Sequence, residues 1–207
     1  MTENTEDPTA DIAWMRRLAE EGAEVPMQGA SILFGAGLIY GVGSLCHWAV
    51  ARGFTGFGMA AVNVVWLAAT TLFLAVLVIT LIRLKRAGGV RTSANRASST
   101  AWASVGWGIF ALSVSMAALS WRLGEDAALV TIALMPSMIM VFYGSGWAVS
   151  AAMQRSKALW ALAIGSFAAA PLLAALTGSA EQYLAYAAAL FLLMALPGWI
   201  LMRQARA

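Results

Sequence analysis

Two neighbouring side chains near the end of the first apolar segment, Cys46 and His47, could do chemistry. A histidine can bind a metal, carry a proton or respond to pH, and a thiolate can bind a metal or act as a nucleophile. The chain holds one histidine and one cysteine in all, whereas a zinc site needs about three or four ligands. We therefore expect no cofactor and interpret His47 as an interfacial side chain within reach of water, with a pH sensor or single metal ligand as the alternative.

A serine between glycines lies in the fourth apolar segment, in the run Tyr143-Gly144-Ser145-Gly146. Intramembrane serine proteases activate such a serine with a histidine on a later helix. No histidine follows Ser145, so its hydroxyl lacks a base and we expect no catalysis. Tyr143 and Ser145, together with Asn63 in the second apolar segment, stay as weak functional candidates because their polar groups can form hydrogen bonds between helices.

Small residues four positions apart indicate close helix packing. Gly37 and Gly41 have this spacing in the first apolar segment, and Gly144 and Ala148 have it in the fourth. The spacing places both members on one helix face and lets another backbone approach. We expect these residues to join helices within the chain or between copies. The tryptophans that lie deepest in the apolar segments are also expected to pack between helices: Trp66, Trp107 and Trp147.

The composition that surrounds these residues is that of a membrane protein. Hydrophobic residues make up 61% of the 207 residues and charged residues 11%, against about 45–50% and about 25% in soluble domains. Six stretches without Asp, Glu, Lys or Arg are long enough to cross about 30 Å of hydrocarbon as helices. We predict an all-α polytopic fold with six transmembrane helices. The predicted spans are 29–51, 59–82, 101–121, 128–150, 158–177 and 183–202.

The distribution of basic residues predicts the topology. Eleven of the 13 Lys and Arg residues lie in the two tails and in the second-to-third and fourth-to-fifth connections, and only Arg52 and Arg122 lie on the other side. Basic residues of membrane proteins stay on the cytoplasmic side. We therefore expect a protein of the bacterial inner membrane with both termini in the cytoplasm. The domains are then a cytoplasmic tail (1–28), a membrane domain (29–202) and a short second tail (203–207).

The first tail predicts a short amphipathic helix. Asp7 can cap it, Pro8 suits its first position, and Gly22 can end it, which gives a helix over 8–21. Its modest apolar face favours a position on the inner leaflet, with a cytoplasmic protein partner as the alternative.

Faint repeats favour three helical hairpins, made of spans 1 and 2, 3 and 4, and 5 and 6. A Gly-x-Gly pattern begins at Gly35 in the first span and at Gly106 in the third. A Gly-Trp pair occurs at Gly146 in the fourth span and at Gly198 in the sixth. Repeats of this kind occur in transporters, and the same echoes also arise by chance in apolar sequence.

These patterns favour a non-catalytic helper, sensor or assembly factor that acts through helix packing and its cytoplasmic tail. A small transporter or channel for a neutral or apolar solute is the alternative, since Pro136, Pro171 and Pro197 can kink the last three spans. A membrane enzyme ranks third. The expected partners are the lipid bilayer and either a second copy or another membrane protein. Nucleic acid is not expected, because the basic residues lie in loops and form no patch.

Overall fold

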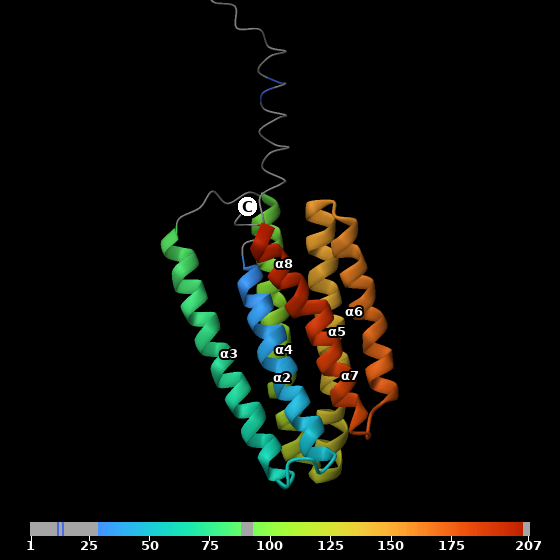
Figure 1. The fold of residues 1–207 in the computed structure, drawn as a ribbon. Coiled ribbons are helices and arrows are strands. Elements are labelled where there is room, and N and C mark those ends of the chain that lie inside the picture. Colours follow the sequence, from blue (N-terminus) through green and yellow to red (C-terminus); the bar gives the residue numbers. More distant parts are fainter. Residues whose placement is uncertain (1–11, 13, 15–28, 88–92, 205–207) are drawn as a thin grey trace, which may run out of the picture.

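The computed structural model describes residues 12, 14, 29–87 and 93–204. Within these ranges the long elements are all helices, and six of the spans that they form are long and apolar enough to cross a membrane (Figure 1). This confirms the predicted all-α polytopic fold. The elements are α2 (Ala30–Ala51), α3 (Ala60–Ala87), α4 (Ser93–Leu123), α5 (Glu125–Gln154), α6 (Lys157–Ala175), and a sixth span formed by α7 (Glu181–Leu190), the π-helical segment η1 (Phe191–Ala195) and α8 (Leu196–Gln204).

The second and third spans extend further than the apolar stretches that predicted them. Helix α3 continues to Ala87, so Arg83 and Arg86, which the sequence assigned to a loop, are helical. Helix α4 begins at Ser93 and includes Arg96. Arginine and lysine are good helix formers, and cations near a helix C-terminus are favourable. The helices therefore extend beyond the apolar residues at this end.

The spans pack in two groups. Helix α2 contacts α3 and all three parts of the sixth span, and α5 contacts α4 and α6. The first two predicted hairpins, α2–α3 and α4–α5, are thus packed pairs. Helices α6 and α7 follow each other in the chain but touch only sparsely, because α6 packs on α5 and α7 on α2. In Figure 1, α3 stands apart on the left and α6 lies at the right edge.

Glycines bring α2 into backbone contact with the sixth span. A Cβ atom added to Gly198 would lie 2.6 Å from the Phe34 amide nitrogen and 3.0 Å from the Ala30 carbonyl oxygen. A Cβ atom on Gly41 would lie 2.6 Å from the Phe191 ring. Close approach of this kind requires small residues, and it holds α2 against η1 and α8, the later parts of the sixth span.

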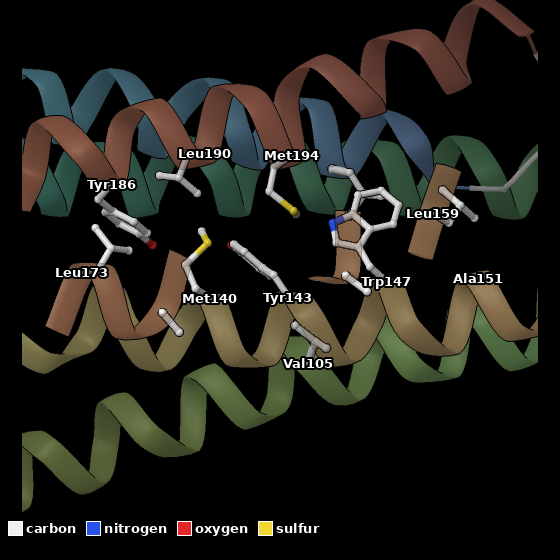
Figure 2. Close-up of a cluster of buried hydrophobic side chains, with 13 residues drawn as sticks. Val105, Met140, Tyr143, Trp147, Ala151, Leu159, Leu173, Tyr186, Leu190 and Met194 are labelled. Carbon is white, nitrogen blue, oxygen red and sulfur yellow. The ribbon is translucent and has the colours of Figure 1, made fainter. Parts of the chain in front are cut away.

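The core lies between α5 and the sixth span. Figure 2 shows Leu190 and Met194 pointing toward Met140 and Trp147, and all four side chains are fully buried. Trp147 also binds the sixth span directly, because its indole Nε1 donates to the Leu193 carbonyl oxygen at 3.0 Å. That carbonyl would normally accept from the amide four residues later, which is Pro197 and has no hydrogen. The carbonyl that the proline frees is thus satisfied within the core.

The predicted amphipathic helix over 8–21 lies outside the described residues, apart from Ile12 and Trp14, which are helical and exposed. Both chain ends of the described bundle, at Gly29 and Gln204, lie at the end where α3 finishes (top of Figure 1). The α2–α3, α4–α5 and α6–α7 connections lie at the opposite end. The helix ends at the first end carry seven basic residues in the sequence: Arg83, Lys85, Arg86, Arg96, Arg155, Lys157 and Arg203.

Candidate functional site

His47 lies in a polar and aromatic cluster that joins three helices. Its Nδ1 atom accepts a hydrogen bond of 3.1 Å from the Trp66 indole on α3. Its ring stacks on Tyr183 of α7, with 3.5 Å between ring centroids. The Ser44 hydroxyl donates to the Tyr183 carbonyl oxygen at 2.8 Å and ties α2 to α7 at the same level. His47 is 6% exposed, so it faces the interior and not water as an interfacial histidine would.

The hydrogen bond from Trp66 defines the chemical state of His47. An indole N–H can only donate, so the Nδ1 atom that accepts from it carries no proton. The imidazole is therefore the neutral tautomer with its hydrogen on Nε2. In this state His47 ties α2 to α3 through a hydrogen bond between side chains. The tether matters because α2 is the described helix against which α3 packs most extensively.

An ion pair lies beyond His47, where α2 ends and α7 begins. Arg52 and Glu181 form an ion pair of 3.1 Å between the end of α2 and the start of α7, with both side chains about half exposed. Cys46 is exposed, in contrast to His47 beside it. Across the described ranges, no group of three His, Cys, Asp or Glu residues is close enough to hold a metal.

A second polar junction, at Gln182, was not predicted from the sequence. The Gln182 amide nitrogen donates to the Ala133 carbonyl oxygen of α5 at 2.6 Å and to the Leu173 carbonyl oxygen of α6 at 3.1 Å. It also lies 3.4 Å from the Thr177 hydroxyl. The side chain is 1% exposed, so these bonds hold α5, α6 and α7 together in the interior. Its one sequence signal was a glutamine beside Glu181 at the very start of an apolar span.

The remaining sequence candidates lie apart from His47. Tyr143 is buried in the α5 core, 6.2 Å from the Trp102 ring. Ser145 is exposed, and its hydroxyl donates to the Val141 carbonyl oxygen of its own helix. Asn63 is exposed near the start of α3. The structure therefore does not bring these polar residues together into one site.

The predicted small-residue pairs lie at helix contacts within the chain. A Cβ atom on Gly144 would lie 2.7 Å from the Phe167 ring of α6, and Ala148 packs against the core. On α2, a Cβ atom on Gly37 would lie 2.9 Å from the Leu190 carbonyl oxygen. Together with Gly41, these residues join helices of one copy.

Gly106 on α4 is different from the other glycines of the transmembrane helices. A Cβ atom added to Gly106 would meet nothing within 4 Å, whereas each of the other nine described helix glycines has a neighbour at that distance. The nine with neighbours are Gly35, Gly37, Gly41, Gly43, Gly108, Gly144, Gly146, Gly165 and Gly198. At the other nine helix glycines another segment comes close, whereas the space beside Gly106 is open among the described residues.

Gly106 is the centre of an exposed stripe of small residues. We define the Gly106 face as Ser99, Ala103, Gly106, Ser113 and Ala117, all of them exposed. These residues recur every three or four positions, with Phe110 between Gly106 and Ser113, so they lie along one side of the helix. Beside them Trp107 is 72% exposed, which corrects the expectation that it packs between helices. Trp107 is exposed because α4 contacts α5 through other residues, such as Trp102 and Val105.

The two peripheral helices, α3 and α4, expose different surfaces. Only 6% of the most apolar stretch of each is buried, compared with 44% in α2. The open surface of α3 consists mostly of large aliphatic side chains such as Leu67, Leu72 and Val78. Large aliphatic side chains suit lipid, whereas small residues suit another helix. The Gly106 face of α4 is therefore the better candidate for a protein contact.

Fold and surface together define the class: the chain is an α-helical membrane protein with six spans and a small-residue face on its third span, α4. No family model, no curated protein and no solved structure matches the chain.

Proposed function

We propose that this chain is a non-catalytic protein of the bacterial inner membrane that helps to assemble or stabilise a partner membrane protein. In this proposal the Gly106 face binds a transmembrane helix of that partner. The observation that carries the proposal is the open position of Gly106, in a bundle where the other described helix glycines all meet a neighbour. Small-residue faces are the usual basis of helix association in lipid, where no hydrophobic force drives the helices together.

The cytoplasmic position of both termini is part of the same proposal. Its support is the asymmetry of charge between the two ends of the bundle. Arg52 and Arg122 are the basic residues at the end that carries the α2–α3 and α4–α5 connections, and the other described Lys and Arg residues lie at the opposite end. Basic residues remain on the cytoplasmic side during insertion.

The packing of the interior weighs against transport, the alternative function. Met140, Trp147 and Leu190 fill the space between α5 and the sixth span with no exposed surface (Figure 2). The Trp147 indole and the Gln182 amide use their hydrogen atoms on backbone carbonyls of neighbouring helices. A solute path would need unfilled space or free polar groups along the bundle, so helix association is the better-supported function.

Replacing Gly106 by leucine tests the proposal. A side chain at this position meets nothing in the chain, so G106L should insert and fold like the wild type. The same change at Ala75, which is exposed on α3, is the matched control. With the tagged full chain purified in mild detergent, we expect G106L to lower the yield of a stoichiometric membrane partner about tenfold and A75L to leave it unchanged. A partner retained by G106L, or lost equally in A75L, would contradict the proposal.

A further inference from the structure

The contact between His47 and Trp66 is compatible with only one charge state of the histidine. The Trp66 indole N–H donates to the Nδ1 atom of His47 at 3.1 Å, and an indole nitrogen cannot accept a hydrogen bond in return. A protonated imidazole carries hydrogen on both of its nitrogens, so two N–H groups would then face each other across this contact. Protonation of His47 therefore replaces a hydrogen bond by a repulsive contact between two donors.

The elements that pack around His47 supply little charge to stabilise a protonated imidazole. On α7, Tyr183 stacks on the ring with 3.5 Å between centroids, and a tyrosine is uncharged below about pH 10. The Glu181 carboxylate of α7 already binds Arg52 at 3.1 Å. On α2 itself, Cys46 is exposed, whereas His47 is buried. The half of α3 that begins at the α2–α3 connection contains no charged residue.

Helix α3 is attached to α2 by different kinds of contact along its length. Near its start, Trp66 supplies the hydrogen bond to α2. Further along, the contacts are apolar: the Tyr40 ring lies 5.3 Å from the Phe73 ring, and a Cβ atom on Gly35 would lie 3.3 Å from the Val76 side chain. Acid does not change the charge of any of these apolar groups. Loss of the Trp66 contact should therefore free the start of α3 and leave the rest of the helix in place.

We propose that His47 is an acid-sensitive tether, which on uptake of a proton releases Trp66 and lets the start of α3 move away from α2. His47 lies about one turn before α2 ends at Ala51, so the proton comes from the solvent at the α2–α3 connection. In the topology proposed above, this end faces away from the cytoplasm. The tether joins α2 and α3 and is separate from the Gly106 face of α4, so its response to acid does not depend on the proposed partner.

Nuclear magnetic resonance of the full chain with ¹⁵N-labelled tryptophan tests the hydrogen bond. The protein in mild detergent is titrated from about pH 8 to about pH 4, which includes the value of about 6.5 at which an unperturbed histidine changes charge. The Trp66 indole signal is assigned with W66F. We expect this signal to shift in one reversible transition as acid is added. H47N is the matched control, because an asparagine oxygen can accept the bond at the position of Nδ1 but takes up no proton in this range. Its Trp66 signal should not shift.

Distances between spin labels test the movement of α3. The exposed Cys46 is first replaced by alanine, so that labels attach only where they are wanted. One pair of labels, V64C and L129C, joins the start of α3 to the start of α5. The other pair, I82C and I200C, joins the later part of α3 to α8. All four positions are exposed. In acid we expect the first distance to lengthen and the second to stay the same.

Four results would overturn the proposal. The Trp66 signal of the wild type could fail to shift down to about pH 4, or it could shift equally in H47N. It could also lose its transition in E181Q, which would assign the titration to the ion pair with Arg52 and not to His47. Finally, both label distances could lengthen together, which would show general loosening of the bundle. Circular dichroism at each pH measures whether the helices stay intact.

Discussion

Replacing Gln182 by methionine should loosen the junction of α5, α6 and α7. Methionine is close to glutamine in length and keeps the packing, but it cannot donate a hydrogen bond. The Ala133 and Leu173 carbonyl oxygens would both lose the donor that now lies at 2.6 and 3.1 Å. No water reaches the site to replace it, because Gln182 is 1% exposed.

The size of the effect follows from these two bonds. Hydrogen bonds between membrane helices contribute about 0.6 kcal/mol on average and up to about 1.7 kcal/mol each. The weaker contact to the Thr177 hydroxyl, at 3.4 Å, adds little. We therefore expect Q182M to lower the free energy of unfolding by about 1–3 kcal/mol.

Unfolding in mixed detergent micelles, followed by circular dichroism, measures this free energy, and Gln154 provides a matched control. The Gln154 amide nitrogen is buried without a hydrogen-bond partner among the described residues. Q154M removes the same atoms but no bond, so its stability should stay at or above that of wild type. Equal losses in Q182M and Q154M would refute the view that the Gln182 bonds hold the junction.

Three further predictions concern the other junctions. W66F removes the hydrogen-bond donor to His47 and should lower the free energy of unfolding by about 0.6–1.7 kcal/mol. If the pair acts as one tether, W66F should have no such effect in an H47F background, which a double-mutant cycle of unfolding measures. G198V places a side chain against the Phe34 backbone, where a Cβ atom already lies 2.6 Å from the amide nitrogen. It should destabilise the fold by about 1–3 kcal/mol in the same assay. G106A meets open space and should leave stability unchanged or raise it by up to about 1 kcal/mol, so a large loss would mean that Gly106 is packed within the chain.

The sequence was sufficient to predict the spans because charge and apolar residues separate cleanly along the chain. The ends of α3 and α4 were predicted too short, since Arg83 and Arg96 continue the helices beyond the apolar stretches. Pairing of the last two spans was harder to foresee. It depends on where Gly41 and Gly198 meet other segments in space, and spacing along the chain does not contain that information.

Burial was the property that the sequence predicted least well. His47 was interpreted as facing water and is buried, and Trp107 was expected inside and is exposed. In a membrane protein both the interior and the lipid-facing surface are apolar, so an apolar neighbourhood does not reveal the direction of a side chain. Gln182 was overlooked for a related reason. A single polar residue at the boundary of a span is interpreted as an interfacial residue when the carbonyl oxygens that accept its hydrogen bonds are unknown.

Site-specific photocrosslinking from α4 in the native membrane tests the central proposal most directly. A photoreactive amino acid replaces Ala103, which lies one turn from Gly106 on the same exposed face, and in a separate variant it replaces Ala75 on α3. The account predicts one discrete crosslinked membrane protein from position 103 and mainly lipid adducts from position 75. That product should disappear when G106L is added. Lipid adducts alone from position 103, or a product of two copies of this chain, would contradict a partner helix on the Gly106 face.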